Sequence, residues 1–67
     1  MSQFAAQLAK VLEKLPEKEQ MVMALHYQED LSYREIAEVL NLTTGRISQL
    51  HTQGMIRIRS HLKVSVN

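Results

Sequence analysis

The stretch from Ser32 to Arg59 constrains the fold more than any other part of the chain. It contains two segments in which apolar residues recur at helical spacing, and each segment begins at a hydroxyl side chain suited to cap a helix. Only Asn-Leu-Thr separates the two segments, which leaves room for no more than a tight turn. The sequence therefore predicts two helices joined by a short turn, the arrangement called a helix-turn-helix.

Ser32 is the predicted cap of the first of these helices. Glu35 follows three residues later, so the two side chains can satisfy each other's backbone amides in a capping box. Ala37 supplies the small side chain required where the two helices cross. Asn41 is expected to end the helix, because asparagine tolerates the left-handed backbone conformation found at many helix ends.

The second helix of the pair is predicted to run from Thr44 to about Leu62, with Thr43 as its cap. Its predicted inward side consists of Ile47, Leu50, Gly54, Ile58 and Leu62. Gly54 costs such a helix about 1 kcal/mol relative to alanine. We expect a neighbouring helix to approach so closely there that no side chain fits, and a hinge is the alternative.

Two further helices are predicted in the first half of the chain. One covers about Gln3 to Lys14, and Pro16 then ends it and starts the next, because proline is tolerated at the first helical position. The next helix ends near Gln28 to Asp30. The residues expected to face inward are Phe4, Leu8, Val11, Leu12, Leu15, Met21, Val22, Ala24 and Leu25. No stretch alternates with the period of a strand, so residues 1–67 are predicted to form one all-α, four-helix domain with its helix-turn-helix at about 32–60.

Composition excludes several classes of protein. There is no cysteine, and the three histidines lie far apart without companion carboxylates, so we expect neither a disulfide nor a metal site. No apolar run approaches the roughly 20 residues of a membrane span, and no secretory signal is recognisable. Clustered carboxylates, a serine–histidine pair and a glycine-rich phosphate loop are missing as well. The expectation is a cytoplasmic protein that is not an enzyme, holds no cofactor and does not contact a membrane.

The charges are distributed unevenly, although the net charge is only +1. Residues 1–43 carry seven acidic and four basic side chains, a net charge of −3. Residues 44–67 carry four basic side chains and no acidic one, a net charge of +4. This asymmetry suggests that the C-terminal half faces a polyanion, and a chance imbalance on a solvated surface is the alternative.

The second helix of a helix-turn-helix lies in the major groove of DNA, so its outward face is the candidate base-reading surface. Gln49 is predicted to read a base, because a glutamine amide can form two hydrogen bonds with adenine. Arg46 is predicted to hold a phosphate. The other residues predicted to contact DNA are Thr43, Thr44, Gly45, Ser48 and Thr52 around the start of that helix, Tyr33 and Arg34 in the preceding one, and Arg57 farther along.

Several of these assignments have a structural alternative. Tyr33 could equally pack against the second predicted helix. Gln49 and Ser48 could be solvated surface, and Arg57 could be an ordinary solubilising charge. His51 is expected to be a partly buried helix residue and not a ligand.

The chain resembles region four, the C-terminal promoter-recognition region of bacterial RNA polymerase sigma factors. The resemblance is carried by the segment LPEKEQMVMALHYQEDLSYREIAEVLNLTTGRISQLHTQGMIRIRSHL. The resemblance covers about residues 8 to 62 and lies in the leucine-proline opening, the REIAEVL helix, the arginine before ISQL and the closing IRIR. The run from Ser48 to His51 is especially similar to the flagellar (motility) type.

The resemblance implies that the chain reads the upstream, minus-thirty-five promoter element in double-stranded DNA. It places Thr44, Gly45 and Gln49 where family members read bases and Arg46 at a common backbone contact. Thr44 and Gly45 depart from housekeeping members, which carry larger charged residues there, and this favours an alternative sigma factor. The implied protein partners are the beta flap of the RNA polymerase core and, in the flagellar type, an anti-sigma factor.

Two other interpretations remain open at this stage. The same fold could act as a protein-interaction module that holds the flap or an anti-sigma factor without reading DNA. An output domain of the response-regulator type has a similar four-helix plan, although its valine-lysine pair and dimerising last helix are not evident. A monomer is expected for the isolated domain, which is either a piece of a longer sigma factor or a free-standing small regulator.

Overall fold

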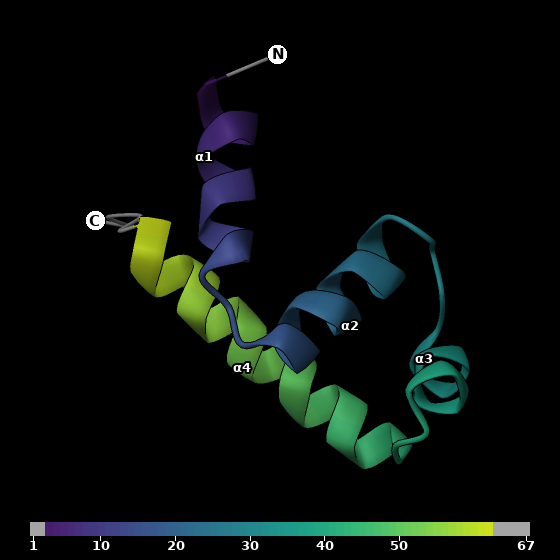
Figure 1. Cartoon of the computed structure of the whole chain (residues 1–67). Helices are drawn as coiled ribbons and strands as arrows, with labels where there is room; N and C mark the ends of the chain where they lie inside the picture. Colours follow the sequence, from purple (N-terminus) through teal and green to yellow (C-terminus); the bar gives the residue numbers. More distant parts are fainter. Residues whose placement is uncertain (1–2, 63–67) are drawn as a thin grey trace.

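The structure, a computed structural model, describes the backbone of residues 3–62 and the side chains of residues 5–62. It contains the helices α1 (Gln3–Glu13), α2 (Glu17–Tyr27), α3 (Tyr33–Leu40) and α4 (Thr44–Leu62). The long helix α4 packs against the other three: α1 lies beside its C-terminal half, α2 crosses its middle and α3 lies against its start (Figure 1). Residues 3–62 contain no strand, so the predicted all-α fold with a helix-turn-helix formed by α3 and α4 is confirmed.

The predicted caps of the helix-turn-helix are present. The Ser32 hydroxyl accepts a hydrogen bond from the Glu35 amide at 3.1 Å, and the Glu35 carboxylate accepts one from the Ser32 amide at 2.9 Å. The hydrogen bond from the Ser32 amide, and secondarily the Ser32 hydroxyl beside the carboxylate, lower the pKa of Glu35. Asn41 ends α3 in the left-handed conformation with φ of 57°, and the Thr43 hydroxyl accepts from the Arg46 amide at 3.1 Å. Pro16, in contrast, is the residue before α2 and not its first helical residue.

Replacing Ser32 with alanine is expected to lower the free energy of unfolding by about 1 kcal/mol, because the Glu35 amide then loses its acceptor. Urea denaturation followed by circular dichroism measures the change. Ser60→Ala is the matched control, since Ser60 is exposed within α4 and alanine is favoured there. Equal stability of the two variants would contradict a role for the capping box.

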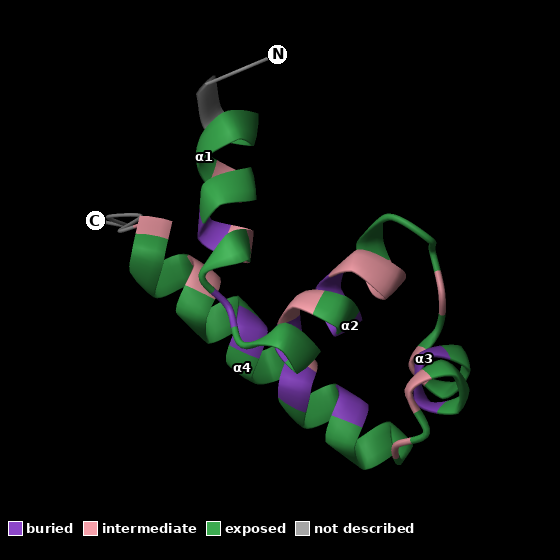
Figure 2. Cartoon of the chain, viewed as in Figure 1, coloured by how far each residue is buried: buried purple, intermediate pink, exposed green. Residues whose placement is uncertain are grey.

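The core of the helix-turn-helix lies between α2, α3 and α4. It is built from the buried residues Val22, Ile36, Ala37, Ile47 and Leu50, with Leu25, Leu31, Tyr33, Leu40 and Leu42 packed around them. The buried positions of α4 face the other helices along one side (Figure 2). Ile58 and Leu62 continue this side half-buried, as predicted.

The expectation for Met21 was wrong. Its side chain is 39% exposed, because α2 turns Glu19, Val22 and Met23 toward the interior instead. These three positions share one face of the helix, whereas Met21 lies toward the opposite face. The expectation for Phe4 lies outside the described side chains.

Gly54 is buried where α4 meets α2. A β-carbon added at this position would overlap the methyl end of Met23 and would lie 3.8 Å from the Cβ of Glu19. A neighbouring helix therefore packs against Gly54, as expected, and the atom that a β-carbon would displace is the flexible end of the Met23 side chain.

Candidate nucleic-acid interface

The outward face of α4 is formed by small and polar side chains near the start of the helix. Every predicted DNA-contacting residue except Tyr33 is exposed. Ile47 and Leu50 are buried beneath this face, with exposed fractions of 0% and 3%, and they hold α4 against the other helices. The exposed residues of this face, which we call the reading face, are Thr44, Gly45, Ser48, Gln49 and Thr52. They extend along one side of the helix over about two turns, which is the length of helix that fits a major groove.

The structure brings two of the predicted contact residues together. The Arg46 guanidinium donates a long hydrogen bond of 3.4 Å to the side-chain oxygen of Gln49. Both side chains are exposed, so this contact is weak and is readily exchanged for others. A free Gln49 amide could then pair with adenine while Arg46 turns to a phosphate.

Tyr33 occupies a different environment from the other candidates. It is half-buried against the core of the helix-turn-helix, and its hydroxyl forms a 2.8 Å hydrogen bond with Nδ1 of His51. The Tyr33 ring also lies 5.3 Å from the ring of His26 on α2, so it packs against the second helix, which was the alternative to a DNA contact. Arg34 beside it is exposed and remains available for a phosphate.

His51 connects α4 to both α2 and α3. Its Nε2 atom is 2.6 Å from the hydroxyl of Tyr27 on α2, in addition to the bond between Nδ1 and Tyr33 on α3. The ring of His26 lies 5.3 Å from that of His51, measured between centroids. Partial burial, and secondarily the nearby His26, lower the pKa of His51 below its ordinary value. Sequence reasoning expected a partly buried His51 but did not find this cluster, because its members lie 18 and 24 residues apart.

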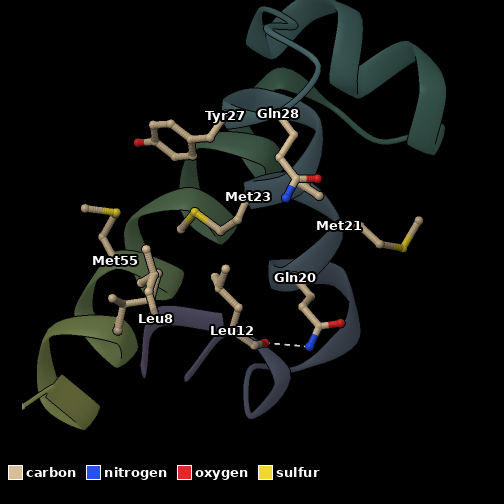
Figure 3. A pocket seen from close by; sticks show the side chains of 10 residues that line it. Leu8, Leu12, Gln20, Met21, Met23, Tyr27, Gln28 and Met55 are labelled. Carbon is tan, nitrogen blue, oxygen red and sulfur yellow. Dashed lines mark hydrogen bonds between the residues drawn. The ribbon is translucent and has the colours of Figure 1, made fainter. Parts of the chain in front are cut away.

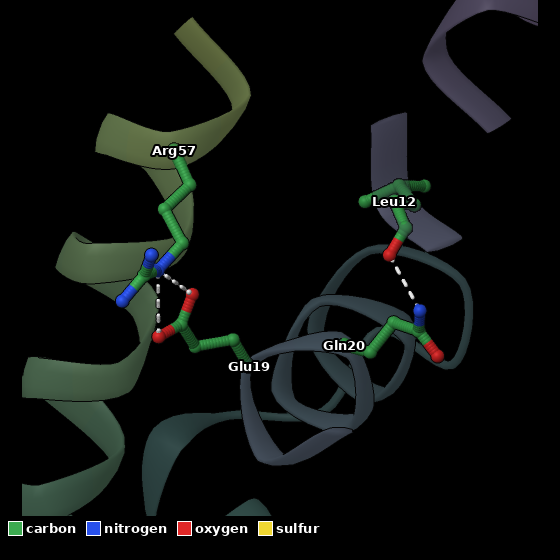
Figure 4. A network of polar contacts seen from close by, with 4 residues as sticks. All are labelled: Leu12, Glu19, Gln20 and Arg57. Atoms are coloured by element: carbon green, nitrogen blue, oxygen red, sulfur yellow. Dashed lines mark hydrogen bonds and ion pairs between the residues drawn. The ribbon is translucent and has the colours of Figure 1, made fainter. Parts of the chain in front are cut away.

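Arg57 forms an ion pair that no pattern along the chain predicts. Its Nε atom lies 3.0 Å and 3.2 Å from the two carboxylate oxygens of Glu19, a buried residue of α2 that is only 3% exposed (Figure 4). The pair joins the middle of α4 to α2. The side chain of Arg57 is 52% exposed, so a phosphate contact remains a prediction while the contact to Glu19 is already made.

An apolar groove of about 640 Å³ lies between α1, α2 and α4 (Figure 3). Its apolar lining includes Leu8, Leu12, Met21, Met23, Met55 and Ile58. At one edge the Gln20 side chain donates a hydrogen bond of 2.5 Å to the Leu12 carbonyl, which ties α2 to α1. Periodicity along single helices did not predict this groove, because the groove is a space left between three helices where they pack together.

Comparison with known proteins identifies the family to which this four-helix chain belongs. The family described as Sigma-70, region 4, matches residues 11–60. The chain belongs to the sigma-70 region 4 family. This region is a DNA-binding and regulatory domain, and its family is not one of enzymes.

The similar full-length proteins are also sigma factors. RNA polymerase sigma factor FliA of Pseudomonas aeruginosa is 49% identical over 88% of this chain and 24% of its own length. RNA polymerase sigma-D factor of Bacillus subtilis is 47% identical over 87% of the chain and 23% of its own length. FliA of Escherichia coli K12 is 41% identical over 91% of the chain and 26% of its own length. A comparison with solved structures found no match.

The predicted resemblance to sigma factors of the flagellar type is confirmed by these relatives. The region 4 chain spans about a quarter of the length of the relatives it matches. Within residues 3–62, no helix is long and apolar enough to cross a membrane. The same part of the chain contains no group of three or more side chains placed to hold a metal ion.

Proposed function

We propose that this chain binds the upstream, minus-thirty-five element of a promoter and thereby helps RNA polymerase to start transcription in the cytoplasm. The supporting observation is the reading face of α4, which is exposed, free of acidic side chains and fixed from beneath by Ile47 and Leu50. In a helix-turn-helix this is the surface that enters the major groove. The names of the relatives, all RNA polymerase sigma factors, agree with the proposal.

In this proposal Gln49 reads a base at the centre of the reading face. Gly45 allows the backbone to approach the DNA closely. A β-carbon there would meet nothing nearer than the Thr43 hydroxyl at 4.0 Å, so packing within the domain does not require this glycine. Thr44 and Gly45 are small where housekeeping sigma factors carry larger charged residues. A promoter preference different from the housekeeping one follows.

Affinity of the isolated domain is expected to be modest. Four to six phosphate contacts give a slope of log affinity against log salt of about −4 to −5. Binding to polymerase would raise the effective concentration of the domain at the promoter. The beta flap is the proposed site of that tether.

Gln49→Ala is expected to lower affinity for the promoter duplex by about tenfold and to change affinity for a scrambled duplex little, because a base contact is lost. Arg46→Ala is expected to weaken both duplexes to a similar extent and to reduce the salt slope by about 1. Fluorescence anisotropy at several salt concentrations measures both effects. Gln7→Ala is the matched control, since Gln7 is an exposed glutamine on α1 and not on the helix that carries the reading face. Equal losses from Gln49→Ala on the two duplexes would refute the base-reading role.

A second candidate function is supported by the apolar groove between α1, α2 and α4. Its volume of about 640 Å³ and its leucine and methionine lining suit the apolar face of a partner helix. The beta flap of polymerase or an anti-sigma factor would supply that helix. Binding of the domain to core polymerase without DNA tests this candidate, and full occupancy with no DNA preference in any condition would favour it over DNA reading.

A further inference from the structure

We propose that His51 is the positioning residue of α4: by bridging Tyr27 of α2 and Tyr33 of α3, it sets the orientation in which α4 presents the reading face. The orientation is a property of the fold alone. Its consequence for DNA recognition rests on the proposed function. The three residues are called the His51 bridge below.

The geometry of the bridge fixes the imidazole ring from two sides. One ring nitrogen is 2.6 Å from the Tyr27 hydroxyl and the other is 2.8 Å from the Tyr33 hydroxyl. Rotation of α4 about its axis, or sliding along it, would lengthen at least one of these hydrogen bonds. The buried contacts of Ile47 and Leu50 hold α4 close to its neighbours, but apolar contact is not directional. Hydrogen bonds weaken steeply with angle, so the bridge restrains the direction of the helix.

The bridge lies next to the residues that matter for recognition. His51 follows Gln49 by two positions and directly precedes Thr52, so a rotation of α4 that displaces His51 moves both of these residues as well. A binding site of this kind must be held within about 0.5 Å of its working geometry. Tyr27 is itself 60% exposed, and its hydroxyl is therefore not held in place by burial.

With a neutral His51, one ring nitrogen donates to one tyrosine while the other accepts from the second tyrosine. A protonated ring would donate to both hydroxyls, which can also accept, but it would place a positive charge in the partly buried cluster beside His26. In the neighbouring His26, Nδ1 is the nitrogen that carries a hydrogen. It lies 2.8 Å from the Leu31 carbonyl oxygen, which can accept a hydrogen bond but cannot donate one. The titratable groups recorded against the His51 ring are His26 and Tyr27 from α2 and Tyr33 from α3.

None of these recorded neighbours is a carboxylate, so a protonated His51 has no counter-ion within the described cluster. Burial and His26 lower its pKa below the ordinary value of 6.5. The unfolded chain therefore binds the proton more readily than the folded one. The stabilisation contributed by the neutral bridge is complete above about pH 6.5 and declines as the pH falls through the lowered pKa.

Helix orientation is the direct test. Residual dipolar couplings of backbone amides report the direction of α4 relative to α3 in the wild type, His51→Leu and Tyr27→Phe. Both variants are expected to change that direction or to broaden its distribution. His61→Leu, the same substitution at an exposed position of α4, is expected to leave it unchanged. Tyr27→Phe removes one hydroxyl from an exposed ring and keeps the fold, so it stays informative if His51→Leu unfolds. Wild-type couplings in Tyr27→Phe and in any folded His51→Leu would overturn the proposal.

The preference for promoter over scrambled duplex is the second readout. As the pH falls from about 7.5 through the lowered pKa of His51, this ratio is expected to fall about threefold to tenfold in the wild type and in His61→Leu. In His51→Leu the ratio is expected to start lower and to stay flat. A wild-type pH profile in His51→Leu would overturn the proposal. A wild type without any duplex preference would refute the proposed function, and the dipolar couplings would still decide the role of His51.

Discussion

Ile47→Ala is expected to lower the free energy of unfolding by about 3 kcal/mol, the largest effect among the substitutions considered. Ile47 is one of the three largest fully buried side chains, and it lies in the core shared by α2, α3 and α4. Removing its outer carbons loses their burial and leaves a cavity that the two flanking helices can close only partly. A domain of this size has only about 3 to 5 kcal/mol of stability, so a large fraction of the variant should be unfolded near 37 °C.

Ile56→Ala is the control for this prediction. It is the same substitution in the same helix, but Ile56 is 63% exposed. Its stability should remain within about 0.5 kcal/mol of the wild type. Thermal and urea unfolding followed by circular dichroism measure both variants, and a loss below about 1 kcal/mol for Ile47→Ala would show that this core does not hold α4 in place.

Arg57→Met is expected to lower the free energy of unfolding by about 2 kcal/mol. It removes the cation from Glu19 and leaves a carboxylate that is only 3% exposed without its partner. Breaking a buried ion pair in this way costs about 3 to 5 kcal/mol, and the 52% exposure of Arg57 reduces this figure because solvent already screens the pair.

Two further variants isolate the ion pair. Arg59→Met makes the same change at an exposed position two residues away and should be nearly neutral. Combining Arg57→Met with Glu19→Gln should recover much of the lost stability, because a neutral amide is less costly to bury than an unpaired carboxylate. Chemical denaturation of the three variants measures these differences, and a double variant no more stable than Arg57→Met would contradict the account.

Features that depend on neighbouring residues could be predicted from the sequence. The capping box between Ser32 and Glu35 and the left-handed end of α3 at Asn41 involve residues within one helical turn, so their geometry follows from local chemistry. The inward side of α4 follows from the period of the helix in the same way. The exposure of the reading face followed from that period, whereas the role of Gln49 in reading a base stays a prediction.

Features that depend on how helices meet could not be predicted. Glu19 and Arg57 are 38 residues apart, and no pattern marks them as partners. The assignment of Met21 to the interior failed for a related reason, since the rotation of α2 about its axis is set by its contacts with α4. The His51 bridge and the apolar groove likewise exist only after three helices have packed.

The arrangement separates two surfaces on one long helix. The start of α4, beside α3, carries the reading face, whereas its later turns form the apolar groove with α1 and α2 (Figure 1). The Glu19–Arg57 pair and the His51 bridge both join α4 to α2. A domain built in this way could hold DNA and a protein partner at the same time, as recruitment of polymerase to a promoter requires.

Fluorescence anisotropy of this domain on a duplex carrying a flagellar-type upstream promoter element, compared with a scrambled duplex at several salt concentrations, tests the central proposal most directly. Preference for the promoter duplex, with affinity that falls as salt rises, is the predicted result. Equal binding to both duplexes, or none to either at low salt, would contradict sequence-specific reading by α4.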